Sequence, residues 1–234
     1  MQPEFDELIF PPFEGFPKEG IAFLKKLKRN NDREWFAAHK EEFEETVKFP
    51  MQCLIATLEP LFAGFAPEFD VNPKKSLFRI YRDTRFSRDK TPYKTHIAAH
   101  FELRRKPRIM DGAGFYLHIE PGEVFLGGGI YMPDNDQLKK IRRAVSGHSK
   151  EFLAVIASPK FKKHFGTIQG SKLSRPPKGF SVDDPMIEYL KLKQFFAGVE
   201  WKEETCYKKD FAGRIASVSK EITPFINFLN EAMT

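Results

Sequence analysis

The sequence predicts a single α+β domain, built on a central antiparallel sheet of four or five strands with N- and C-terminal helices packed mainly on one face. Three observations lead to this fold class. Apolar residues recur at helical spacing near both ends of the chain, the middle alternates apolar and polar residues as strands do, and no linker or repeat divides the chain. We therefore expect an irregular lead-in over residues 1–17 and one domain over residues 18–234.

The composition is that of a soluble globular protein. The 234 residues are 41% hydrophobic and 30% charged, and no apolar run approaches the ~20 residues that span a bilayer. The amino terminus lacks the basic and apolar regions of a secretory signal, and the two cysteines, Cys53 and Cys206, do not form a disulfide framework. We expect a cytoplasmic protein without membrane contact, and its oligomeric state stays open.

Two helices are predicted in the amino-terminal quarter. The first runs from about Lys18 to Arg29, with basic residues near its end, where cations interact favourably with the helix dipole. The second follows an N-cap at Asn31 or Asp32 and keeps helical spacing for about 28 residues. Pro50 is expected to kink or divide this second helix.

The middle of the chain predicts the sheet. Runs of alternating or β-prone residues are bounded by glycine and proline, and Pro121-Gly122 makes a turn between two of them. The expected strands are 77–82, 96–103, 114–119 and 124–131, with 195–201 as a fifth strand if it pairs.

The remainder is predicted to be mostly helical. The final helix, about Glu203 to Ala232, carries an apolar seam and is expected to be interrupted at Pro224. Before it we expect helices from the Asp134 cap through Val145, from Ser149 to Ala157, from Pro159 to Phe165, and a short one started by Asp184-Pro185.

Basic residues concentrate in the segment that follows the first expected strand. Residues 76–108 carry ten Lys and Arg against three Asp and Glu, a surplus of seven, while the whole chain has a net charge of +6. Planar guanidinium groups suit carboxylate or phosphate oxygens. The predicted anion site consists of Arg79, Arg82, Asp83, Arg85 and Lys90, and its ligand would be a small anion, phosphorylated ligands included.

Two other interpretations of the same arginines stay open. In one, the aspartates pair with the arginines in an ion-pair network that stabilises a turn. In the other, an extended basic surface binds a nucleic-acid backbone. That surface would combine residues 74–108 with Lys172, Arg175 and Lys178.

Three histidines fall on the polar faces of the expected strands. His96 and His100 lie four strand residues apart, about 13 Å, so they cannot share one metal ion, although either could meet His118 across strands. We expect no metal and no cofactor. Tyr93, His96 and His118 are the candidates for moving a proton, and whether any reaction is catalysed stays open.

Glycines 127–129 interrupt an otherwise good strand. Such a run marks a bulge, a close approach by another backbone, or a ligand that passes over the sheet. No phosphate-binding loop and no nucleophile elbow is present in the sequence. We place the expected pocket on the helix-free face of the sheet or at its rim near residues 82–94.

Several segments together resemble one family of proteins. They are the arginine signature (Arg79, Arg82, Asp83, Arg85, Phe86, Lys90, Pro92, Tyr93), NNDREWF from Asn30, GFYLHIEP, GGGIYMP and LSRPPKGF. The chain resembles, over roughly residues 16–229, a bacterial family of conserved proteins of about this length that is known as a domain of unknown function. The resemblance implies no particular reaction or ligand.

Overall fold

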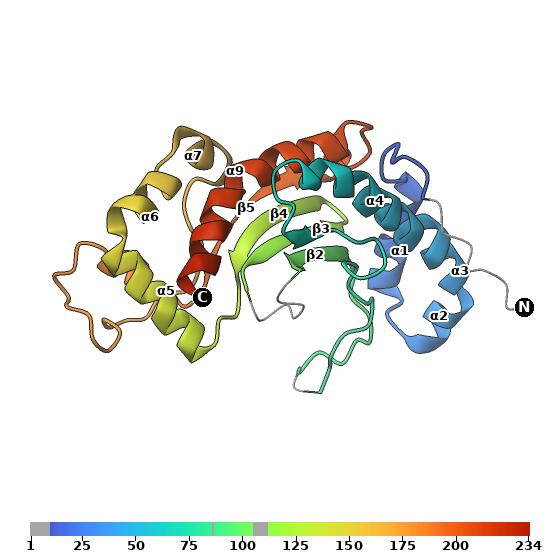
Figure 1. The fold of residues 1–234 in the computed structure, drawn as a ribbon. Coiled ribbons are helices and arrows are strands. Elements are labelled where there is room, and N and C mark those ends of the chain that lie inside the picture. Colours follow the sequence, from blue (N-terminus) through green and yellow to red (C-terminus); the bar gives the residue numbers. More distant parts are fainter. Residues whose placement is uncertain (1–9, 86, 105–111) are drawn as a thin grey trace, which may run out of the picture.

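The described strands form one antiparallel sheet whose spatial order follows the chain order. The computed structural model describes residues 10–85, 87–104 and 112–234. The strands, in the order β1-β2-β3-β4-β5, are β1 (Phe69–Asp70), β2 (Ile97–Leu103), β3 (Gly114–Glu120), β4 (Glu123–Ile130) and β5 (Phe195–Lys202). The predicted α+β fold with helices from both ends of the chain is confirmed (Figure 1).

Helices precede and follow the sheet in the chain. They are α1 (Lys18–Arg29), α2 (Arg33–Ala38), α3 (Lys40–Phe43), α4 (Phe49–Ala63), α5 (Asn135–Gly147), α6 (Ser149–Ile156), α7 (Pro159–Phe165), α8 (Ile187–Leu190) and α9 (Phe211–Ala232), with a π-helical turn at Glu44–Lys48 and a 3-10 turn at Glu203–Thr205. The predicted bounds of α1 and α7 are confirmed.

The long second helix of the prediction is divided, but not by Pro50. Asp32 caps α2 as predicted, because its carboxylate accepts a hydrogen bond from the Trp35 amide at 2.8 Å. The helix is then interrupted at His39, and after α3 its backbone forms the wider π-helical turn. Pro50 lies at the start of α4, directly after that turn, and Lys48 and Phe49 keep helical backbone angles, so the helix continues through Pro50.

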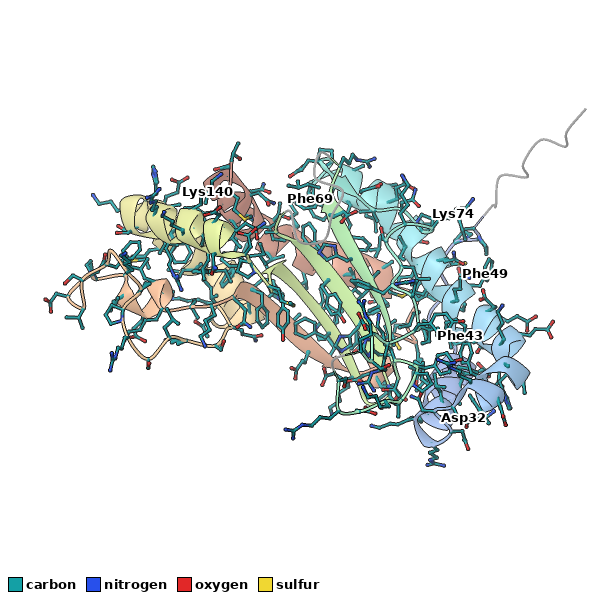
Figure 2. All side chains as sticks on the ribbon, turned by 90° about the horizontal axis from the view of Figure 1, so that it is seen from below. Asp32, Phe43, Phe49, Phe69, Lys74 and Lys140 are labelled. Atoms are coloured by element: carbon teal, nitrogen blue, oxygen red, sulfur yellow. The ribbon has the colours of Figure 1, made fainter. Side chains whose placement is uncertain are left out.

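Two helices cover one face of the sheet. Phe62 of α4 packs against Phe101 of β2 and Phe115 of β3, each pair with ring centroids 5.1 Å apart. In β4, Gly128 leaves the space that Ile226 of α9 fills. Among the described residues no helix lies on the opposite face, which is turned downwards in Figure 1 and towards the viewer in Figure 2.

The predicted strand at 77–82 does not form. Its residues make isolated bridges, Leu77 to Ala99 and Tyr81 to Tyr93. Residues 76–96, which we call the arm, pair with β2 at Ser76 and Phe78. Further along, they bond to one another, as in the Arg82 amide to Pro92 carbonyl bond of 2.8 Å, and project from the sheet (Figure 1). Tyr81 bridges to Tyr93 within the arm and does not extend the pairing with β2, while the carboxyl end of β2 pairs with β1.

Two predicted helix starts and one predicted interruption differ from the structure. The helix expected at Asp184-Pro185 begins at Ile187. The Asp184 carboxylate accepts a hydrogen bond from the Met186 amide, so residues 184–186 form a turn before the helix. The last helix begins at Phe211 and continues through Pro224 without interruption. Burial of its apolar face against the sheet outweighs the hydrogen bond that a proline removes.

Both cysteines, Cys53 and Cys206, are free and buried. Burial raises the pKa of the Cys206 thiol to about 12, so this group is not a ready nucleophile. Within the described ranges, no helix has the length and apolar character needed to cross a membrane.

Candidate functional site

The helix-free face of the sheet, which we call the open face, carries half-buried polar side chains of the strands. Cross-strand register places His100 of β2 opposite Tyr116 of β3, and His118 of β3 opposite Phe125 of β4. Phe125 in turn lies opposite Glu200 of β5. Because side chains alternate between faces, these residues share one side while their neighbours fill the core under α4 and α9.

A cleft of about 600 Å³ lies on this face. Its walls combine aromatic rings, histidines and carboxylates with a strip of glycine backbone. They comprise Phe78, His100, Gly112, Gly114, Tyr116, His118, Glu123, Phe125, Gly127, Gly128, Gly129, Ile130, Tyr131, Met132, Phe196 and Glu200. A pocket was predicted on the helix-free face or at the rim, and the cleft occupies the first of these places.

Glycines shape the floor of the cleft. Gly127 of β4 pairs with Gly198 of β5, and the Phe125 ring lies where a side chain on either glycine would be. Gly129 has φ of +130°, and a Cβ there would collide with the carbonyl oxygen of Phe195. The glycines therefore permit close approach of the Phe125 ring and of the neighbouring β5 backbone.

Two histidines in the cleft have a buried ring nitrogen without a hydrogen-bond partner among the described residues. These atoms are Nδ1 of His100 and Nε2 of His118. Burial lowers the pKa of His100 to about 4 and lowers that of His118 as well, so both rings are neutral at neutral pH. Buried polar atoms in proteins nearly always have partners, so a ligand or water is expected at each.

Carboxylates gather at the end of the cleft near the β3–β4 turn. Burial raises the pKa of Glu123, and the nearby charges of Glu200 and Glu120 raise it further. Nε2 of His118 lies 3.6 Å from Oε1 of Glu123 and 4.0 Å from Oε1 of Glu120. The His96 ring is centred 5.4 Å from that of His118, and burial, followed by the effect of His118, lowers the pKa of His96 to about 4.

The residues of the predicted anion site are paired along the arm. Arg82 contacts Asp89 and Thr91. Arg85 forms a bidentate pair with Asp83, Nε to Oδ1 at 3.0 Å and Nη2 to Oδ2 at 2.7 Å. Lys90 donates to the Thr84 carbonyl at 2.8 Å. These contacts match the ion-pair interpretation, although a ligand-binding role of the same residues stays a prediction.

The arginine heads do not meet in one cavity. Arg82 lines a hollow of about 450 Å³ together with Lys28, Lys94, Tyr93 and other residues at the root of the arm. Arg79 is exposed and lines different hollows. Arg85 is 77% exposed where it pairs with Asp83.

The three candidates for moving a proton have different surroundings. His118 lines the cleft, whereas His96 and Tyr93 line the hollow at the root of the arm. Tyr93 is buried and stacks on Phe36 with ring centroids 4.1 Å apart, and its burial raises the pKa of its hydroxyl. Tyr93 is therefore placed to support the arm more than to exchange protons.

The described parts of the two segments of the predicted nucleic-acid surface lie apart from each other. Both views separate the arm from the loop that carries Lys172, Arg175 and Lys178 (Figures 1 and 2). Lys172 also pairs with Glu188 at 2.8 Å. A backbone-binding groove would need continuous positive charge, so binding of nucleic acid stays a prediction that this geometry does not favour.

A family model described as a conserved hypothetical protein, DUF2461, matches residues 19–228. The chain belongs to the DUF2461 family. This confirms the predicted membership of a family known as a domain of unknown function, while the arginine signature itself stays untested. No curated protein and no solved structure matched the chain.

Sequence reasoning missed several residues of this DUF2461 cleft, among them Glu123, Phe125 and Glu200. One signal was present: a two-residue turn at Pro121-Gly122 fixes the register, so Glu123 must lie opposite Glu120 and on the same face as His118. Nothing local indicated Glu200, because its position depends on how β5 pairs with β4.

Proposed function

We propose that this DUF2461 protein binds a small organic ligand in the cleft on the open face. The observation that carries the proposal is the pair of neutral imidazoles, His100 and His118, in a cleft walled by aromatic rings. Each has a buried nitrogen for which the described part of the chain offers no hydrogen-bond partner. Ligand sites are typically concave, about 300–1,000 Å³, mostly apolar and supplied with a few polar groups. The cleft has each of these properties.

The lining suggests the chemistry of the ligand. Rings of Tyr116, Phe125 and Phe196 favour a planar apolar body that stacks or packs edge-on. Glu123 and Glu200 at one end favour hydrogen-bond donors or positive charge there, and they disfavour a bare anion. A ligand with an aromatic ring and a polar or cationic substituent fits best.

Tyr131→Ala should weaken binding of aromatic fragments about three- to tenfold, because one aromatic contact is worth ~0.5–1.5 kcal/mol. Tyr131 lines the cleft and is 62% exposed, so its loss should leave the fold intact. The measurement is the dissociation constant of the strongest hits from a library of small aromatic amines and heterocycles, first ranked by thermal shift.

Tyr81→Ala is the matched control. Tyr81 is 56% exposed but lies on the arm, outside the cleft. Its loss should not change fragment affinity. Equal weakening by both substitutions, or no hit in the library, would count against the cleft as the site.

A second candidate function is supported by the hollow at the root of the arm. Lys28, Arg82 and Lys94 line it, and Asp89 is the acidic residue among its walls. This hollow is where the predicted small anion, phosphorylated ligands included, would find converging positive charge. The anion would then be recognised by Arg82 and two lysines instead of by three arginines.

Phosphate or sulfate should raise the melting temperature of the parent protein if this hollow binds anions, and Arg82→Ala should abolish the response. A ligand at 100 times its dissociation constant adds ~2.7 kcal/mol to the free energy of unfolding. Arg85→Ala is the control, since Arg85 pairs with Asp83 at the exposed part of the arm. The acidic partner of each pair is exposed, Asp89 at 57% and Asp83 at 59%, so neither substitution leaves a buried charge unpaired and neither should itself lower the melting temperature much.

An unchanged melting temperature in phosphate and sulfate would refute the anion site. If Arg85→Ala also abolished the rise in melting temperature, the anion effect would come from the overall positive charge of the protein and not from binding in the hollow. Tight, steeply salt-dependent binding of single-stranded DNA would favour the nucleic-acid alternative instead.

A further inference from the structure

The turn between β3 and β4 brings three potential metal ligands together. His118 and Glu120 are two residues apart on β3 and so point to the same face. Glu123 begins β4 directly opposite Glu120. One imidazole nitrogen and two carboxylates thus project from the two ends of a single tight turn onto the open face.

The distances between the donor atoms are near those of a metal centre. Nε2 of His118 and one oxygen from each of Glu120 and Glu123 all lie within 4.8 Å of one another. Ligand bonds of about 2.0–2.2 Å place two donors on one ion about 3–3.5 Å apart. Side-chain rotations that move each carboxylate oxygen by less than about an ångström would bring the three donor atoms to these distances. Glu120 and Glu123 are 37% and 38% exposed, so both side chains have room to rotate.

The donor atom of His118 makes no hydrogen bond to any described residue. Its Nε2 is buried and lacks a hydrogen-bond partner, and both carboxylates lie beyond hydrogen-bonding distance from it. The ring is held by a stacked contact with Phe125 at 5.5 Å and an edge contact with Tyr116 at 5.6 Å. These rings fix the direction of the nitrogen, as supporting contacts do for metal-bound histidines.

Local charge also favours a cation. Glu120 and Glu123 lie directly opposite each other in the register, so two carboxylates are held side by side at the end of the cleft. Lys202 lies opposite Glu123 in the register, yet no ion pair within 4.0 Å joins them. Like charges held together at the edge of a low-dielectric cleft are relieved by a bound divalent ion.

We propose that His118, Glu120 and Glu123 form a binding site for a divalent transition-metal ion at the end of the cleft. Imidazole suits zinc, iron and copper, while carboxylates also suit manganese, so the mixed set favours Zn²⁺ or Mn²⁺ over Mg²⁺ or Ca²⁺. Three protein ligands leave coordination positions open towards the cleft. A metal there would hold an oxygen or nitrogen donor of the ligand or polarise it.

The site is tested with Zn²⁺ alone, independently of any organic ligand. Isothermal titration calorimetry of the chelator-treated full chain should show one Zn²⁺ per chain. His118→Ala and Glu123→Gln should each weaken Zn²⁺ binding by at least about tenfold, the scale on which metal ligands and their supports act. Replacement by Co²⁺ should give visible absorption bands in the parent that both variants lose.

His148 and Glu151 provide a matched control. They also form a histidine–glutamate pair, Nδ1 to Oε2 at 3.9 Å, but on the surface of the molecule, 69% and 63% exposed. His148→Ala should leave Zn²⁺ affinity unchanged. Glu123→Gln keeps the shape of the side chain, so it tests whether Glu123 binds Zn²⁺ even if His118→Ala does not fold.

Two results would overturn the proposal. One is the absence of stoichiometric binding of both Zn²⁺ and Mn²⁺. The other is binding that survives Glu123→Gln but is lost in His148→Ala, which would place the ion on the surface. Neither result would affect the fragment measurements on Tyr131, so the metal site and the proposed ligand function fail separately.

Discussion

Gly129→Ala is expected to lower the free energy of unfolding by about 4 kcal/mol. A non-glycine residue at a φ of +130° costs about 1–3 kcal/mol. The new Cβ would also meet the Phe195 carbonyl oxygen, so β5 would have to move, and such overpacking costs about 1–3 kcal/mol more. Urea denaturation of the parent and the variant measures the difference.

Gly213→Ala is the control for this experiment. Gly213 lies in α9 with nothing near the position of a Cβ. Alanine there should stabilise the protein by about 0.5–1 kcal/mol, because glycine is a poor helix residue. Similar effects of the two substitutions would show that the β4–β5 backbone approach is not tight.

The second large effect concerns pH. Burial lowers the pKa of His100 to about 4 from an ordinary value of 6.5, so the unfolded chain takes up a proton at a pH where the folded protein does not. The stability that depends on neutral His100 is complete above pH 6.5. It falls as the pH drops from 6.5 to 4 and is lost below that range. At about 1.4 kcal/mol per pKa unit, the loss is on the order of 3 kcal/mol.

His100→Gln isolates this contribution. His96 and His118 are common to both proteins, so the difference between the two curves of unfolding free energy against pH reports His100 alone. The parent should lose more stability than the variant between pH 6.5 and 4. Parallel curves would mean that His100 is hydrated and titrates normally. The acidic and basic groups around His100 in the neighbouring hollow, Asp70, Lys75, Arg79 and Glu102, are also common to both proteins.

The elements that the sequence predicted correctly are those set by local signals. The bounds of α1 follow from its apolar face and basic end, and β2, β3 and β4 follow from alternation and the turn at Pro121-Gly122. Capping explains α2 and α5, where Asp32 and Asp134 accept backbone N–H groups as expected. In each case a few neighbouring residues determine the structure.

The errors arose where distant contacts decide. Leu77 to Arg82 has strand-like composition, but pairing with β2 involves Ser76 to Phe78 and the chain then turns to pair with itself. Pro224 stays within α9 because that helix packs on β4. The ion-pair partners of Arg82 and Arg85 could be predicted from the sequence, because Asp89 and Asp83 are each less than ten residues away. The face that holds the cleft was also predicted, but its lining was not, because that depends on the pairing of β5 and on the Phe125 ring that covers Gly127.

The most direct test of the proposed function is a map of backbone amide shifts in ¹H–¹⁵N spectra during titration with the strongest aromatic fragment. The account predicts that the largest shifts occur at Gly114, Gly127 and Gly129, whose backbone lines the cleft, together with Phe196. Shifts confined to the arm, or spread evenly over the surface, would contradict a ligand site on the open face.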